Sequence, residues 1–448
     1  MIGEEELKTL SDVFENATDW DSVKLISIQS QTIMDVLDAF SHFPKHVKDY
    51  DAIIHDCWNE TAAVKKGIIK RETFRPSIDD YEAVINGPQF FVCNPCYKTP
   101  RNKCLLNSDY DNIDLMLIDE DFTSLCNYRP VLAKSAYASI IEGFQIGQDQ
   151  KGNPIHDKWL DHYRVAFREM IGSTSERTLT CAILPRRTAH VNAVISIAFR
   201  NRNHCVEMAS ICSSLPMDFY MKTLSVQHVT PNRIEQFPLG IADKYKPSLF
   251  SRTLLLNCLT KHYADLWEEM WEEDYKQESW SIEDKRLKQF ASLTEQWQWA
   301  TPLRNYFERR QALVEIDVIA AMALGLSLQD LEMIYTIQFP VLQQNENDTW
   351  YDAEGKIVFT CSKGLTGVGL DRKRNNKTGI LGWEDIRGEQ IDENTYAGTS
   401  PTHTHTIDPA KSELYGGQQQ TFIAPYNRCD RIADYRTAWA HFEKKFNK

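Results

Sequence analysis

The sequence lacks any hydrophobic run long enough to cross a membrane. Its most apolar stretch, Val318–Leu326, is flanked by Asp317 and Ser327, and falls short of the ~18 or more residues that a transmembrane helix needs. The start of the chain, Met-Ile-Gly-Glu-Glu-Glu, is acidic and therefore resembles neither a secretory signal nor a transit peptide. We expect a soluble cytoplasmic protein with no membrane partner.

A basic surplus is missing too. The 50 Lys and Arg residues are outnumbered by 63 Asp and Glu residues, which gives a net charge of −13. This total excludes a surface that is basic throughout, but nucleic-acid binding needs only a local positive face. Many of the acids lie between Asp265 and Lys285, a stretch that we interpret as a solvated helix face.

The common catalytic and metal-binding motifs are absent. The chain has no Ser-His-Asp elbow and no His-Glu-x-x-His signature. The next cysteines after Cys93-x2-Cys96 are the widely split Cys104 and Cys126, whereas structural zinc sites usually have two tight ligand pairs. We predict no metal site and no catalytic residue. The 11 cysteines are an odd number, and without an export signal we expect reduced thiols.

What is present is an ordinary globular composition. Hydrophobic residues make up 42% and charged residues 25% of the 448 residues, which excludes a disordered chain, a collagen-like fibre and a coiled-coil rod. The length suits two to four domains. We predict a mixed α/β protein of the α+β type, made of an N-terminal helical module (1–73), a DNA target-recognition region (74–245), a helical spacer bundle (246–345) and a small strand- and loop-rich C-terminal domain (346–448).

The apolar spacing predicts individual elements within these regions. Leu25, Ile26, Ile33, Val36, Leu37 and Phe40 recur at helical spacing. The other expected elements are a linker within 143–154, a helix over Trp159–Ile171, a buried strand over Thr178–Leu184, a helix over Cys205–Leu224 interrupted by Pro216, helices through 249–345, a hairpin over 349–360, a long mobile loop over 388–420 and a last helix over Arg431–Phe446.

One string has a catalytic look. An apolar strand runs into Asn94-Pro95-Cys96-Tyr97, as in amino-methyltransferases, where Asn and Pro hold the exocyclic amine and the aromatic ring stacks on an extruded base. The usual third residue is Pro, and no glycine-rich turn for the methyl donor lies upstream of Asn94. The string therefore favours a structural turn over a catalytic loop.

A second string, Lys363-Gly364-Leu365-Thr366-Gly367-Val368-Gly369, invites comparison with a phosphate-binding loop. Such a loop should run into a helix, but this one runs into Asp371-Arg372-Lys373-Arg374. Five basic residues face one acid between 363 and 377. We predict either a solvated loop or a loop that follows phosphates, with Lys363, Arg372, Lys373 and Arg374 in contact with DNA.

Three further basic patches carry small polar residues. Each follows a predicted strand or helix and thus lies on a loop that a rigid body could aim into a groove. Arg and Asn can read guanine and adenine edges, while Lys mainly finds phosphate. The candidate DNA-binding residues are Lys98, Arg101, Asn102 and Lys103 in the first patch, Arg186, Arg187, His190 and Asn192 in the second, and Lys222 with His228, Asn232 and Arg233 in the third.

Several long strings resemble one protein family. They include Gly87–Arg101, Ser214–Lys222, Ile234–Leu239, Leu255–Trp267, Arg310–Asp317, Tyr335–Leu342 and Ala424–Arg431. Together they resemble the C-terminal target-recognition and spacer region of large adenine-specific DNA methyltransferases from bacterial phage-defence systems of the type IIG restriction-modification, BREX and DISARM kinds, and are most similar to the DISARM methylases.

The resemblance implies recognition of a specific DNA sequence for an adenine N6-methyltransferase. It implies that the catalytic loop and the S-adenosylmethionine site lie on a partner subunit or a missing domain, with no cofactor on this chain. The expected partners are double-stranded DNA, the methyltransferase and other proteins of the defence system. Two alternatives stay open: a self-contained methyltransferase that uses Asn94, Pro95 and Tyr97, and an assembly scaffold that does not touch DNA.

Overall fold

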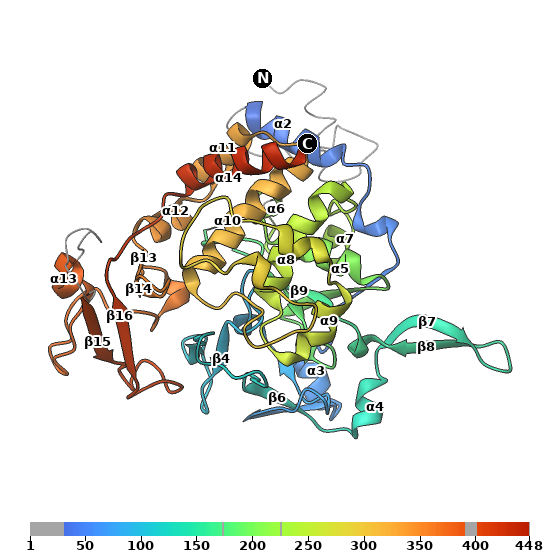
Figure 1. Cartoon of the computed structure of the whole chain (residues 1–448). Coiled ribbons are helices and arrows are strands. Elements are labelled where there is room, and N and C mark those ends of the chain that lie inside the picture. Colours follow the sequence, from blue (N-terminus) through green and yellow to red (C-terminus); the bar gives the residue numbers. More distant parts are fainter. Residues whose placement is uncertain (1–30, 173, 225, 390–400, 448) are drawn as a thin grey trace.

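The computed structural model describes residues 31–172, 174–224, 226–389 and 401–447. It is a mixed α+β protein, as predicted, with most of its helices gathered on one side of a small sheet and several hairpins around them (Figure 1). The helices are α2 (Gln31–Ser41), α3 (Glu60–Lys65), α4 (Lys134–Ala138), α5 (Arg202–Cys212), α6 (Leu215–Thr223), α7 (Pro231–Ile234), α8 (Lys246–Asn257), α9 (Ala264–Glu269), α10 (Tyr306–Ala323), α11 (Leu328–Gln338), α12 (Pro340–Asn347), α13 (Trp383–Ile386) and α14 (Arg431–Phe446).

The central sheet has four antiparallel strands in the order β1-β12-β9-β10. Its strands are β1 (Ala52–His55), β12 (Val194–Phe199), β9 (Arg164–Arg168) and β10 (Cys181–Leu184). β10 confirms the strand predicted over Thr178–Leu184. The helix predicted over Trp159–Ile171 is wrong, because that segment forms β9 at the middle of the sheet. Residues 164–167 are all buried, so the strand lacks the alternation that would have identified it.

The helices build the main hydrophobic core against this sheet. The largest cluster of buried side chains runs from Met34 in α2 to Phe442 in α14. The interruption predicted at Pro216 is confirmed: α5 ends at Cys212, and α6 begins at Leu215 after Ser214, whose hydroxyl accepts a hydrogen bond from the Met217 N–H. A serine cap followed by proline starts a helix well but cannot continue one.

The predicted spacer is helical only in part. α8 and α10–α12 lie where helices were expected, but between α9 and α10 the chain forms irregular turns with two short 3₁₀ helices, Glu273–Gln277 and Phe290–Ser292. The acidic stretch 265–285 is also not a simple solvated face, since Glu278 is buried.

The remaining strands pair two by two: β2 (Ile69–Phe74) with β6 (Cys126–Pro130), β3 (Val84–Ile85) with β11 (Ala189–His190), β4 (Lys98–Pro100) with β5 (Tyr110–Asn112), β7 (Glu142–Gln148) with β8 (Pro154–Lys158), β13 (Trp350–Tyr351) with β14 (Ile357–Phe359), and β15 (Thr402–Thr406) with β16 (Gln419–Ile423). The β7–β8 hairpin stands where a linker was predicted over 143–154, and it extends away from the body (Figure 1). The hairpin predicted over 349–360 is confirmed by β13–β14, and the last helix by α14.

The predicted N-terminal helical module and the predicted loop 388–420 are only partly covered by the described residues. Leu25 and Ile26 lie outside the described residues, and the rest of the predicted helical module contains β1 and β2 besides α2 and α3. The loop predicted over 388–420 contains β15 and reaches the start of β16, while residues 390–400 lie outside the described part. No helix within the described ranges is long and apolar enough to span a membrane.

Candidate nucleic-acid interface

The loop that follows β14, residues 360–372, packs against the segment around β4 and β5. The Tyr97 hydroxyl donates a hydrogen bond of 2.5 Å to the Gly364 carbonyl, and the Asn112 side-chain amide donates one of 2.7 Å to the Thr366 carbonyl. A Cβ atom on Gly364 would lie 2.7 Å from the Tyr97 hydroxyl oxygen, so this close approach requires glycine. Two segments more than 250 residues apart in the sequence are thereby held together.

The β4–β5 hairpin loop makes the second contact with the C-terminal region. Arg101 donates from Nε to the Asp111 carboxylate (2.8 Å) and from Nη2 to the Lys411 carbonyl (2.5 Å). The backbone and side chain of Asn102 both donate to Glu413. These bonds place the first basic patch beside the segment around Lys411.

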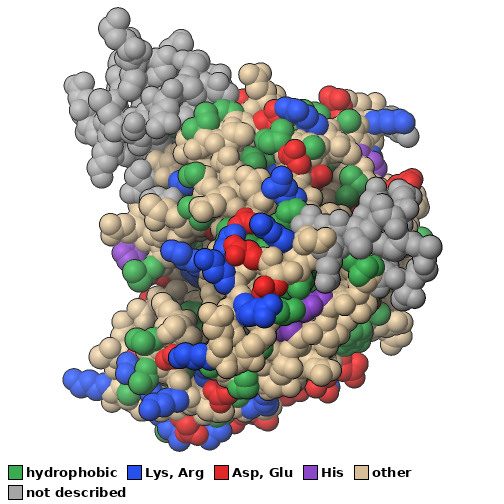
Figure 2. All heavy atoms as spheres, turned by 90° about the vertical axis from the view of Figure 1, so that its left-hand side faces the viewer, with side chains coloured by type: hydrophobic (Ala, Val, Ile, Leu, Met, Phe, Trp, Pro, Cys, Tyr) green, Lys and Arg blue, Asp and Glu red, His purple; other side chains and the backbone are tan. Residues whose placement is uncertain are grey.

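The basic loop 363–374 borders the same region. Lys411 forms an ion pair with Asp371, and a groove of about 310 Å³ lies between this loop and the segment that carries β15 and Lys411. Figure 2 looks onto this side of the molecule and shows Lys and Arg side chains spread across it, several of them next to acidic side chains. The structure thus brings together two of the four predicted basic segments.

The charges in these two segments are not equally available. Lys103, Lys363 and Lys373 are exposed, and their ammonium groups form no ion pair or hydrogen bond with any residue that the structure describes. Arg372 pairs with Asp348, and Arg374 lies 3.4 Å from Asp385. The three lysines are the groups best placed to meet phosphates.

Lys98 has a different environment. Burial, followed by the charge of Arg168, lowers the pKa of Lys98 to about 8, and its ammonium nitrogen lies 5.1 Å from the centre of the Tyr97 ring. The Lys98 ammonium therefore contributes to the packing around the Tyr97 ring rather than to a contact with DNA at the surface.

The second patch is engaged with acids of the same chain. Arg186 lies 2.5 Å from Asp265, and Arg187 lies 2.9 Å from Asp79. His190 is 0% exposed, so its side chain cannot reach DNA in this fold. The side-chain oxygen of Asn192 accepts a hydrogen bond from the Glu60 backbone N–H, which ties it to the start of α3.

The third patch lies on α6, α7 and the loop between them. Lys222 donates to the Gln338 carbonyl at the end of α11, and its nitrogen lies 4.8 Å from the centre of the Phe339 ring. His228 pairs with Glu169 at 2.5 Å, while Asn232 and Arg233 lie in α7. The partners named here for the second and third patches, which are Asp265, Asp79, Glu60, Gln338 and Glu169, are not among the residues that line the groove.

The string Asn94–Tyr97 forms a tight turn. The side-chain oxygen of Asn94 accepts a hydrogen bond of 3.1 Å from the Cys96 N–H. The Tyr97 ring is 8% exposed and stacks on Phe91, with 5.0 Å between the ring centres. Since the Asn94 oxygen and the Tyr97 hydroxyl are bonded within the chain, the geometry favours the structural turn over a methyl-transfer pocket.

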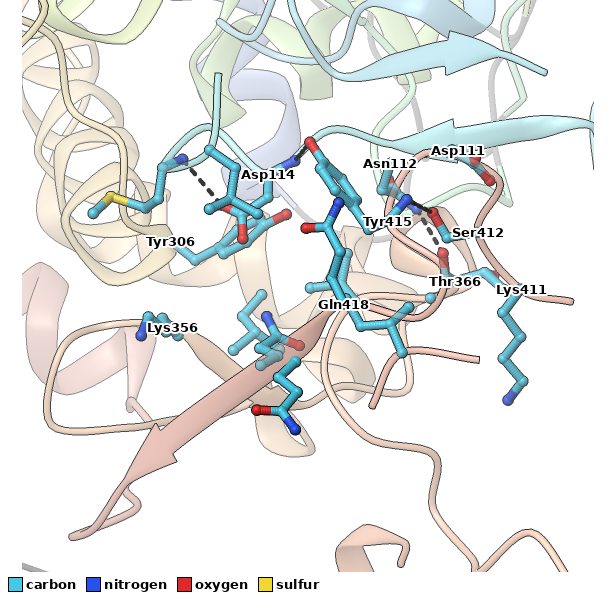
Figure 3. Close-up of a pocket in the computed structure, with 18 of the residues that line it drawn as sticks. Asp111, Asn112, Asp114, Tyr306, Lys356, Thr366, Lys411, Ser412, Tyr415 and Gln418 are labelled. Atoms are coloured by element: carbon cyan, nitrogen blue, oxygen red, sulfur yellow. Dashed lines mark hydrogen bonds between the residues drawn. The ribbon is translucent and has the colours of Figure 1, made fainter. Parts of the chain in front are cut away.

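The structure also contains features that sequence reasoning missed. A cavity of about 160 Å³ lies beside the groove, lined by Asn112, Asp114, Tyr306 and Tyr415 among others (Figure 3). These residues come from three distant segments and match no motif, so no local pattern in the sequence pointed to a site there. No group of His, Cys, Asp and Glu side chains among the described residues could hold a metal ion, and all 11 cysteines are free.

His405 lies in β15 beside the groove. Its ring stacks on Phe422 with 5.5 Å between the ring centres, and burial, followed by repulsion from His403, lowers the pKa of His405 to about 4. The imidazole is therefore neutral at neutral pH, and it adds no charge to the groove.

Comparison with known proteins adds no relative to this description. No protein-family model matches the chain, and no curated protein matches it.

Proposed function

We propose that this chain binds double-stranded DNA and provides target recognition for an adenine N6-methyltransferase, carried by a partner subunit or domain that holds S-adenosylmethionine. One observation supports this most directly: the first basic patch and the basic loop 363–374, which are about 260 residues apart in the sequence, meet at one place. Lys363 and Lys411 line the same groove, and the Lys411 carbonyl accepts a hydrogen bond from Arg101 of the first patch. Basic residues from two such segments beside one groove suit a nucleic-acid backbone.

The charge distribution agrees with this proposal. Lys103, Lys363 and Lys373 carry charges that no acid of the described chain neutralises, whereas Arg186 and Arg187 of the second patch are paired. Unpaired cations attract phosphates and displace counterions from DNA, whereas cations that are paired with an acid do so far less. We therefore restrict the interface to the first patch and the loop 363–374.

The alternative of a self-contained methyltransferase has less support, because the Asn94 oxygen and the Tyr97 hydroxyl are already bonded within the chain. The scaffold alternative makes no use of the exposed lysines. Incubating the chain alone with S-adenosylmethionine and DNA tests the first alternative, since turnover by the isolated chain would support it.

The direct test is DNA binding as a function of salt. The affinity of the full chain for a duplex should fall with a slope of about 0.9 log units per log unit of salt for each phosphate neutralised. A variant with Lys103→Ala, Lys363→Ala and Lys373→Ala should bind more weakly, and its slope should be smaller by about 3.

The matched control removes three other exposed lysines, Lys65, Lys66 and Lys151, which lie on α3 and the β7–β8 hairpin. It changes the net charge by the same amount and should leave the affinity and the slope close to those of the unchanged protein. Equal losses in both variants would contradict the proposed interface, and a flat salt response would contradict DNA binding itself.

A further inference from the structure

The cavity beside the groove is lined by three segments that are far apart in the sequence. Asn112 and Asp114 come from β5 and the residues after it, Tyr306 is the first residue of α10, and Tyr415 and Gln418 lie in the segment that leads into β16 (Figure 3). Its volume of about 160 Å³ is well below the ~300–1,000 Å³ of sites for drug-sized ligands. It has room for a single small ring system and not for a whole nucleotide.

The wall offers hydrogen-bond acceptors that no protein group uses. The side-chain oxygen Oδ1 of Asn112 is buried and has no partner. Asp114 accepts one bond at Oδ1, from the Met116 N–H, and none at Oδ2 from the described residues. Burial raises the pKa of Asp114, which means that its ionised form would gain from a donor. A ligand that fits must therefore bring N–H groups.

A donor and an aromatic wall complete the site. The Tyr306 hydroxyl makes no hydrogen bond with any described residue, and burial raises its pKa, so it remains a phenol that can donate. The Tyr415 hydroxyl accepts from the Asp114 N–H at 3.0 Å, which fixes its ring at the cavity. Rings and amides of this kind surround planar heterocycles in proteins.

The charges around the cavity exclude an anion. Lys356 lies 2.7 Å from Glu354, and Lys411 pairs with Asp371, so both cations in the wall are neutralised. The carboxylate of Asp114 would repel a phosphate or a carboxylate. A neutral ligand is left as the better match.

From these groups we infer that the cavity binds a nucleobase that carries an exocyclic amine, such as adenine or cytosine. The amine supplies N–H donors to Asn112 Oδ1 and Asp114 Oδ2, and the adjacent ring nitrogen accepts from the Tyr306 hydroxyl. Thymine has no amine and only one N–H donor, so it fits this pattern poorly.

The base could come from a free nucleoside or from a nucleotide extruded from DNA. The second source rests on the proposed function, and the position of the cavity is suited to it. Lys411 lines both the cavity and the groove, and its carbonyl accepts from Arg101 in the first basic patch. A duplex bound along the groove would lie next to the cavity mouth.

The experiment uses the full chain and has two arms. In the first arm, adenosine, cytidine and thymidine are titrated separately, and binding is followed by calorimetry. In the second arm, a duplex that contains 2-aminopurine, an adenine analogue with an exocyclic amine, is added, and its fluorescence reports extrusion from the stack. Asp114→Asn and Tyr306→Phe are the test variants, and Tyr245→Phe at the start of α8 is the matched control.

We expect adenosine and cytidine to bind at least fivefold more tightly than thymidine, or the 2-aminopurine signal to rise on DNA binding. Each test variant should weaken that response about 2–12-fold, the range for one hydrogen bond, while the control leaves it unchanged. Tyr306→Phe removes a hydroxyl without a protein partner, so its melting temperature should stay the same and folding will not confuse the result.

The inference is overturned if neither arm responds, if thymidine binds as well as adenosine, or if the test variants bind like the control. These outcomes are separate from those of the proposed function. Nucleoside binding without any DNA affinity would contradict DNA recognition alone, whereas salt-dependent DNA binding without a response in either arm would contradict the cavity alone.

Discussion

Burial decides what several side chains in this protein can do, and His190 is the clearest case. Its ring nitrogens lie 2.8 Å from the Ser196 hydroxyl and 3.2 Å from the Val191 carbonyl. Burial, followed by repulsion from Arg164, lowers the pKa of His190 to about 3. The sequence predicts His190 to contact DNA because it lies near Arg186 and Arg187. In the structure its imidazole is instead buried and neutral.

His190 should make stability fall in mild acid. The unfolded chain takes up a proton near pH 6.5, whereas the folded chain does so only near pH 3, so the unfolded state is favoured progressively as the pH drops from about 6.5 toward 3. Between pH 7 and pH 5 this contributes a loss of about 2 kcal/mol. Urea denaturation at both pH values measures the free energy of unfolding. Its decrease from pH 7 to pH 5 should be about 2 kcal/mol smaller in His190→Gln than in the unchanged protein.

The matched control for this measurement is His42→Gln, since the His42 side chain is 72% exposed. That variant should keep the pH dependence of the unchanged protein. An unchanged pH dependence in His190→Gln would contradict the assignment of His190 as a buried neutral group.

Tyr97 provides a second test at the residue scale. Tyr97→Phe removes the hydroxyl that donates to Gly364 and leaves this half-buried carbonyl without its partner, so it should lower the free energy of unfolding by about 1 kcal/mol. Methylation by the reconstituted enzyme should otherwise be unchanged. If Tyr97→Phe or Asn94→Ala abolished methylation without changing stability or DNA binding, the catalytic alternative would gain support instead.

Among the larger elements, the acidic stretch after α9 is bound to the helices through a buried ion network. Arg252 in α8 lies 2.6 Å from Glu315 in α10 and 3.1 Å from Glu278, and Lys445 in α14 also pairs with Glu278. Arg252 is 0% exposed. The network therefore connects three helices and the irregular turns between α9 and α10.

Arg252→Met should be strongly destabilising. It leaves two buried carboxylates without their main counter-charge, which typically costs about 3–5 kcal/mol. Denaturant unfolding measures this loss directly. Arg200→Met, which breaks an exposed pair with Asp51, should cost no more than about 1 kcal/mol, and similar costs for the two variants would contradict a network role for Arg252.

The elements that the sequence predicted correctly are those with a clear local signal. α14 follows the Asp430 cap, and its apolar residues recur on one face. β9 had no such signal, because buried residues point to both sides of the sheet. The β7–β8 hairpin looked like a linker because five of the seven residues of β7 are exposed, which leaves a strand without an apolar face.

The candidate interface was predictable only in part for a similar reason. The sequence shows where basic residues lie but not which acids meet them. Asp79 and Asp265 neutralise Arg187 and Arg186 from segments 108 and 79 residues away. Such long-range pairing, like the contact between Tyr97 and Gly364, depends on the tertiary fold and has no local pattern.

For the molecule as a whole, the loop 363–374 should position DNA without reading its sequence. Lys373 is exposed and Arg374 is held at 3.4 Å from Asp385, so Lys373→Ala with Arg374→Ala should weaken binding about equally for all duplexes. Binding to a set of duplexes with different sequences measures this. A change confined to sequence preference would instead make the loop a reader of bases.

The C-terminal helix α14 has a consequence for the growing chain. Arg431 holds the buried carboxylates of Asp317 and Glu346, yet it is made 114 residues after Asp317. At about 5–20 residues per second the ribosome needs roughly 6–23 s to supply it. Until then Asp317 in α10 lacks its ion-pair partner, and the core that runs from α2 to α14 cannot close. The nascent protein therefore stays incompletely folded during this interval, and this is when it exposes the most apolar surface to chaperones.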